Sequence, residues 1–236
     1  MPLIRTALSV SGVLECVLCS CLVAEFAGYW LHRLLHSDKL PFLSREHMIH
    51  HFLIYGPQQP MRAKKYKDAT DGRFSAGNVG LEWLVPSALI LFSCWGAMIV
   101  LHVPRVYQFI SLCNLLLWPI LMFSYIHDRM HLRDFWMADA PIIKLWFRKA
   151  RRLHDIHHRN VNDVGHMNTN FGIGFYFFDR LFRTIRKRHR AFNWKGYREA
   201  IGRYGLEDSE LLSLQNCSEA LFRKPPQERM TGSPDG

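Results

Sequence analysis

Histidine is the residue best suited to chemistry in this chain, and its spacing is strongly uneven. Ten of the 13 histidines fall into four short clusters that read HRLLH, HMIHH, HDRMH and HDIHH. Residues three and four positions apart share a helix face, so each cluster is expected to direct two or three imidazoles at one spot. Imidazole binds iron, copper, zinc and nickel, and ten nitrogens suit two ions rather than one. The predicted ligands are His32, His36, His47, His50, His51, His127, His131, His154, His157 and His158.

Residues outside the clusters are candidates for supporting roles, and no catalytic residue beyond the ligands is expected. Glu25 precedes His32 by seven positions and shares a helix face with it. Metal-bound histidines often donate their second N–H group to a carboxylate, so Glu25 is either such a partner or a residue paired with a neighbouring helix. His166 is either an eleventh site histidine or a polar wall of a substrate cavity. His102 and His189 are expected to lie away from the metals.

The composition favours a membrane protein of one domain. The 236 residues carry a net charge of +10, which suggests a nucleic acid or an anionic membrane surface as partner. Long apolar runs alternate with basic, histidine-rich stretches, and this alternation favours the membrane and argues against nucleic acid. Five of the six cysteines lie in the apolar runs. Cys16 and Cys19 have the spacing of a metal pair but are interpreted as core residues, and no disulfide framework is expected.

Three apolar runs, at 7–31, 83–103 and 106–126, are long enough to cross a bilayer. A signal peptide is the alternative for the first, but the run continues into His32 without a clear cleavage site. Pro104 and Arg105 form the turn between the second and third spans. This order places all four clusters on one membrane face, together with most of the basic residues. The positive-inside rule then assigns that face to the cytoplasm, of the inner membrane in a bacterium or the endoplasmic reticulum in a eukaryote.

The predicted fold is therefore all-α and multi-pass, with about three transmembrane helices and a cytoplasmic, histidine-rich helical cap. Residues 139–152 suit a helix that lies in the membrane interface. The catalytic domain is expected to cover residues 1–203. Residues 204–236 are expected to form a polar, partly disordered tail.

The four clusters, in this order, resemble the fatty acid hydroxylase / sterol desaturase superfamily of membrane diiron oxygenases. The resemblance covers roughly residues 20–187. The family's closing segments are echoed by Asn170-Phe171-Gly172 and by the stretch from Phe178 to Thr184. Phe178 stands where the family often has Trp, and Arg183 where it often has Gly. The resemblance adds Asn170 to Glu25 and His166 as a candidate for supporting the ligands or contacting substrate.

The resemblance implies two iron ions, O2 as co-substrate and a lipid of sterol or fatty-acyl type that is hydroxylated or desaturated. Zinc can replace iron in purified protein, since imidazole binds both. The chain carries no cytochrome b5 haem motif, so a separate donor of cytochrome b5 or ferredoxin type is expected. A carotenoid or other isoprenoid hydroxylase is the enzymatic alternative. The non-enzymatic one is a metal transporter, which would place its ligands near the bilayer midplane.

Overall fold

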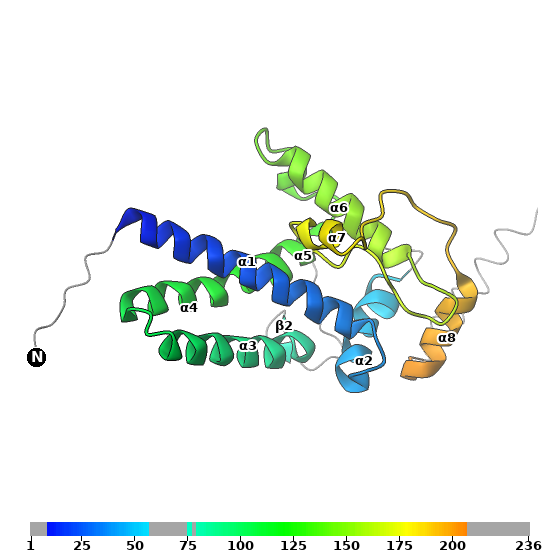
Figure 1. Cartoon of the computed structure of the whole chain (residues 1–236). Coiled ribbons are helices and arrows are strands. Elements are labelled where there is room, and N and C mark those ends of the chain that lie inside the picture. The colour runs from blue at the N-terminus through cyan, green and yellow to red at the C-terminus, as the bar shows by residue number, and fades with distance from the viewer. Residues whose placement is uncertain (1–8, 57–74, 77–78, 207–236) are drawn as a thin grey trace, which may run out of the picture.

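The computed structural model describes residues 9–56, 75–76 and 79–206 (Figure 1). Most of the predicted tail, from residue 207 onward, lies outside the described residues. The described chain is helical except for a short antiparallel pair, β1 (Ser75–Ala76) with β2 (Val79–Gly80). The predicted all-α fold is confirmed for this part of the chain.

Three helices are long and apolar enough to cross a membrane, as the sequence predicted. They comprise Val10–Leu35, Trp83–Val100 and Arg105–Met130. The first is α1 (Val10–Leu35), the second lies in α3 (Leu81–Val100), and the third combines α4 (Arg105–Pro119), η2 (Ile120–Ile126) and α5 (His127–Met130). Two boundaries differ from the predicted spans. The first helix begins at Val10 and continues past residue 31 to Leu35, and Arg105 begins α4 instead of belonging to the turn.

The spans pack as a hairpin of α3 and α4 beside α1, with α1 and α4 side by side (Figure 1). Polar side chains join α1 to α4 along their length. The Asn114 amide donates to the Val17 carbonyl at 3.1 Å, and the Trp118 indole N–H donates to Glu25 at 2.8 Å. The outer faces stay apolar and exposed, with Leu18 at 68% and Leu89 at 64%. Such faces suit contact with hydrocarbon.

The other helices form a cap at one end of the spans (Figure 1). These are α2 (Pro41–Ile49), η1 (His50–Ile54), η3 (Trp136–Ala138), α6 (Lys144–Arg159), α7 (Phe177–Leu181) and α8 (Trp194–Tyr204). One apolar core joins Tyr197 and Ala200 of α8 to Met48 and Phe52 of α2 and η1. A second core packs α6 against η2 and α5. The two apolar cores thus fix the positions of α2, η1 and α6, the cap helices that carry six of the clustered histidines.

Two π-helical stretches lie next to histidine clusters. The first, η1, contains His50 and His51, and the second, η2, ends at Ile126 immediately before His127. Pro119 precedes η2 and has no N–H to give to the helical hydrogen-bond ladder, which accounts for a change of helical pitch at that point. Because π-helical turns change which face a side chain occupies, they adjust the direction of the histidines that they contain or precede.

Candidate metal centre

The ten clustered histidines come together in two groups of five, and every one of them is buried. Within each group, one ligand atom from each ring lies within 4.8 Å of the others. The first group, called the His32 group, comprises His32, His36, His47, His51 and His157, and the second, called the His50 group, comprises His50, His127, His131, His154 and His158. The structure thus brings together all ten predicted ligands, in two sets that can each hold one metal ion.

The groups do not follow the sequence clusters in a simple way. The two-histidine clusters each serve one group, but each three-histidine cluster is divided. His47 and His51 belong to the His32 group, whereas His50 between them belongs to the His50 group. His154 and His158 likewise join the His50 group, and His157 turns to the other one. The expectation that each cluster points at one spot is therefore wrong for the three-histidine clusters, because their helices lie between the two sites.

Ring nitrogens within each group approach one another at the spacing of ligands on a common ion. In the His32 group, Nε2 of His36 lies 3.0 Å from Nε2 of His157 and 3.2 Å from Nε2 of His47. In the His50 group, Nε2 of His154 lies 3.0 Å from Nε2 of His131 and 3.1 Å from that of His158. Two nitrogens bound about 2.1 Å from one ion at right angles are about 3.0 Å apart, so this geometry fits metal ligation.

The protonation of two rings of the His32 group also fits a metal. Nδ1 of His32 donates to the Phe171 carbonyl at 2.6 Å, and Nδ1 of His157 donates to the Thr169 carbonyl at 2.7 Å. A neutral imidazole protonated at Nδ1 carries a lone pair on Nε2. Nε2 of His32 is buried and makes no hydrogen bond in the described structure. A bound cation would satisfy that lone pair, so the residues present fit the implied metal.

Burial keeps these imidazoles neutral and therefore able to bind a cation. Loss of hydration is the largest cause, and it lowers the pKa of His36, His50, His51, His154 and His158 well below its ordinary value, with neighbouring histidines lowering it further. The pKa of His157 falls to about 4 for the same reason, although the Thr169 carbonyl opposes the fall. Neutral imidazoles would leave bound divalent ions with their full charge.

A tightly bonded loop holds the two carbonyls that face His32 and His157. Between them lies Asn170, which is fully buried and has a left-handed backbone (φ 56°). Its amide donates to the carbonyls of Leu153 and Arg186 at 2.9 and 3.0 Å, and its oxygen accepts from the Arg186 N–H at 2.8 Å. These bonds attach the loop to α6 on one side and to the segment after α7 on the other.

The carboxylate of Asp179 holds the same loop through its N–H groups. Its oxygens accept from the N–H groups of Phe171 and Gly172 at 2.8 and 2.7 Å, and from the Thr184 hydroxyl at 2.7 Å. Burial is the largest influence on the pKa of Asp179 and raises it, while these hydrogen bonds oppose the rise. Asp179 and Asn170 therefore fix the backbone that orients two histidines of the His32 group.

Comparison with known proteins agrees with this geometry. The model of the family described as "Fatty acid hydroxylase" matches residues 17–184, which include all ten histidines, Asn170, Asp179 and Thr184. The chain belongs to the fatty acid hydroxylase family. This confirms the resemblance seen in the sequence and makes the chain a member of an oxygenase family of hydroxylases and desaturases. No curated protein and no solved structure matches the chain.

The residues outside the four clusters that the sequence analysis considered lie apart from the two histidine groups. Glu25 is buried between α1 and α4 and bonds to the Trp118 indole, not to a histidine. His166 lies on the cap surface, with its side chain 29% exposed, 2.9 Å from Asp38. His102 follows α3 at its far end, about 30 Å along the helix from Trp83. His189 is exposed and lies 3.5 Å from Asp155.

Aromatic residues that sequence reasoning missed pack directly on the clustered histidines. The Tyr55 ring is stacked 3.7 Å from the ring of His131. The Trp83 ring lies 5.7 Å from His32 and 5.8 Å from His47, and it stacks on Phe123 at 5.5 Å. The position of Tyr55, four residues after His51, was the one available signal, because that spacing continues the histidine face of the helix. Nothing in the sequence connects Trp83 to His32 and His47, which lie 51 and 36 positions earlier.

Proposed function

We propose that the protein is a membrane-bound diiron oxygenase that hydroxylates or desaturates a lipid of sterol or fatty-acyl type. The observation that carries the proposal is the pair of buried five-histidine groups at the ends of apolar spans. Family membership supplies the reaction class. The metal centre is proposed to face the cytoplasm, because the basic residues of the chain gather on the side of the clusters.

The reaction requires a redox metal and two external electrons. Hydroxylation consumes one C–H bond, one O2, two electrons and two protons, and it yields an alcohol and one water. Desaturation consumes two C–H bonds with the same oxidant and electrons, and it yields a carbon–carbon double bond and two waters. Two iron ions, held by the His32 and His50 groups, would supply the O2 activation that protein side chains cannot. A separate one-electron carrier would supply the electrons.

The protein's own residues exclude water and provide an apolar approach from the membrane. Phe123 packs against Gly28 of α1 so closely that a side-chain carbon at Gly28 would overlap its ring. Trp83 lies between Phe123 and the histidines of the His32 group. We infer that a hydrocarbon chain approaches the ions from this side, between α1, α3 and η2, where bulky side chains decide which carbon lies nearest the metals.

Mass spectrometry of lipids tests the proposed function. Cells that express the protein are compared with cells that express His157→Ala at the same level. We expect a lipid that gains one oxygen atom or loses two hydrogen atoms only with the unaltered protein, and this result also separates hydroxylation from desaturation. Identical lipid profiles, with iron bound and an electron donor present, would contradict the proposal.

A further inference from the structure

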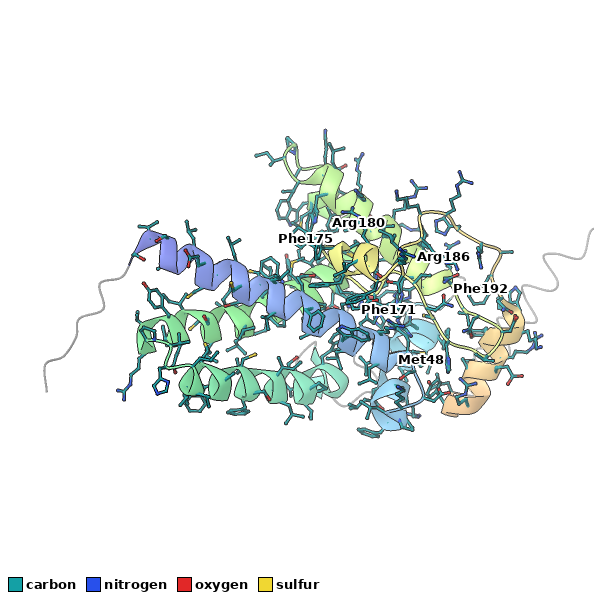
Figure 2. All side chains as sticks on the ribbon, in the orientation of Figure 1. Met48, Phe171, Phe175, Arg180, Arg186 and Phe192 are labelled. Atoms are coloured by element: carbon teal, nitrogen blue, oxygen red, sulfur yellow. The ribbon has the colours of Figure 1, made fainter. Side chains whose placement is uncertain are left out.

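A basic surface covers the cap on the side where α8 lies. From Arg183 to Arg198 every charged side chain is basic. Six of these side chains are exposed, and none forms an ion pair with a carboxylate among the described residues. This surface, called the basic face, comprises Arg183, Lys187, Arg188, Arg190, Lys195 and Arg198. Arg186 and Phe192 mark its course from α7 to α8 (Figure 2).

The basic face is continuous with α6. The guanidinium of Arg152 donates to the Lys187 carbonyl at 3.3 Å, which holds the 183–190 segment against the helix that carries His154 and His157. Arg152 and Lys149 are themselves exposed. A concentration of positive charge on one face attracts acidic partners and accelerates their association. The face therefore suits docking of a negatively charged macromolecule close to the metal ligands.

An aromatic series connects this face to the metal centre. Trp194, 37% exposed, begins α8 and contacts Tyr197 with ring centroids 5.8 Å apart. Tyr197 is buried and contacts Phe52 at 5.1 Å, and Phe52 follows the ligand His51 directly in the chain. The ring of His51 lies 4.9 Å from that of His157 in its own group and 4.0 Å from that of His158 in the other. Packed rings thus run from the surface to a histidine that touches both groups.

We propose that the basic face is the docking surface for an acidic one-electron carrier, which delivers electrons at Trp194 and through Tyr197 and Phe52 to His51. The inference rests on the proposed function, because that reaction consumes two external electrons that arrive one at a time. Each transfer oxidises the reduced carrier by one electron and reduces the metal centre by one. Burial raises the pKa of Tyr197 to about 12, and its hydroxyl has no hydrogen-bond partner among the described residues. The phenol thus has no acceptor for its proton, and its ring serves as part of the packed route.

The binding test uses the full chain, loaded with redox-inactive zinc, in nanodiscs of uncharged phosphatidylcholine. The probe is the soluble haem domain of cytochrome b5, an acidic one-electron carrier. We expect Lys195→Glu to weaken binding about tenfold at low ionic strength, and the difference to vanish near ~0.5 M salt because exposed charges are then screened. Arg105→Glu, the matched control at the far end of the spans, should bind as the unaltered protein does. Retained zinc and an unchanged melting temperature verify that each variant is folded.

The electron-transfer test uses iron-loaded protein and measures how fast the reduced carrier reduces the metal. Trp194→Ala and Tyr197→Leu should slow this step about tenfold and leave reduction by dithionite unchanged. Tyr197→Phe keeps the ring and should keep the rate. Equal carrier affinity for Lys195→Glu and the control, or unchanged rates for Trp194→Ala and Tyr197→Leu, would overturn the assignment.

One further outcome would assign the basic face to a different partner. If Lys195→Glu binds phosphatidylserine vesicles less well but binds the carrier normally, then the surface contacts anionic lipid and the docking proposal fails. The proposed function is judged separately. Carrier binding that depends on the basic face, without any change in cellular lipids, would support docking and contradict lipid oxidation. If cellular lipids are oxidised but Lys195→Glu leaves carrier binding unchanged, the result would support the proposed function and contradict the docking proposal.

Discussion

The His32 and His50 groups contain the same number of imidazoles, five each, but are supported by different parts of the molecule. The His32 group depends on the end of α1 and on a loop whose carbonyls accept hydrogen bonds from two of its rings. The His50 group combines His50 of η1, the two histidines at the start and end of α5, and two histidines of α6, and the ring of Tyr55 stacks on His131. Two parts of the fold contribute to both groups. The segment of α2 and η1 gives two histidines to the His32 group and one to the His50 group, and α6 gives one to the His32 group and two to the His50 group.

Some structural elements therefore support both groups, and others support one group alone. A change in α6 or η1 affects both groups, whereas a change in the 169–171 loop reaches the His32 group first. Residues that orient a ligand without touching the metal typically change metal affinity by about 10–100-fold. Metal binding at the two proposed sites should therefore be weakened one site at a time, and the following experiments use metal content as well as turnover to distinguish them.

Removal of a ligand should have the largest effect. We expect His36→Ala and His131→Ala each to lower turnover at least about 100-fold, because each removes a nitrogen from a buried cage of five. Metal analysis by mass spectrometry should find the loss in the variant's own group, so that about one ion of two remains. His102→Ala, at the far end of α3, is the control and should keep both. Complete loss of both ions in either variant would show that the groups are not separable.

Acid should affect both groups together. Burial lowers the pKa of histidines in each, so the folded, metal-free protein binds fewer protons than the unfolded chain below the ordinary histidine value of 6.5. The contribution of these histidines to the free energy of unfolding is therefore fully present above pH 6.5, and it is lost as the pH falls toward their pKa values in the folded protein. For His157, whose pKa falls to about 4, the loss is about 3 kcal/mol. Urea unfolding of the metal-free protein at several pH values measures it, and a constant free energy of unfolding would contradict the neutral assignment.

Asn170 is the residue that should best discriminate the groups. Asn170→Gly keeps the left-handed backbone but removes three hydrogen bonds from the loop between Thr169 and Phe171. We expect about 10–100-fold weaker binding of one ion only and a loss of about 1–3 kcal/mol in unfolding free energy. Asn170→Ala should cost about 1 kcal/mol more, because alanine strains the left-handed backbone. Equal weakening of both ions in a zinc titration would remove the special connection to the His32 group.

The converse variant is at Tyr55. Tyr55→Leu removes the ring that stacks on His131 and should weaken the ion of the His50 group about fivefold, which corresponds to about 1 kcal/mol for an aromatic contact. Tyr55→Phe keeps the ring and should keep the affinity. If Tyr55→Phe is as damaging as Tyr55→Leu, then the hydroxyl and not the stacked ring supports this site.

The sequence is most informative where spacing alone carries the information. Helical periodicity selects the ten histidines that the structure gathers into two groups, and apolar length predicts the three spans. It could not assign His50 and His157 to their groups, because that depends on a helix lying between two sites and on a π-helical stretch at His50. A local pattern specifies the face of a helix but not which neighbours lie on either side of it.

The supporting residues were harder to predict because they act through the backbone. Glu25 has the residue type and the helical register of a ligand partner, yet the carbonyl of Phe171, far along the chain, accepts from His32. Every residue has a carbonyl, so this partner leaves no signal in composition. The bonds of Asn170 and Asp179 explain why the Asn-Phe-Gly and Asp-Arg-Leu-Phe segments occur together: one turns the loop and the other holds its N–H groups.

His166 should have the smallest effect and defines the outer limit of the site. Its ring lies between Asp38 and Arg203 on the cap surface, at 2.9 Å from an atom of each, and it belongs to neither group. An exposed ion pair contributes at most about 1 kcal/mol, so His166→Ala should lower the melting temperature slightly and leave both ions bound. Turnover should stay within about twofold, because the side chain is 29% exposed and its polar contacts are Asp38 and Arg203, not a clustered histidine. If His166→Ala abolishes turnover while both metals remain, then substrate must reach this surface, and the approach past Trp83 and Phe123 is wrong.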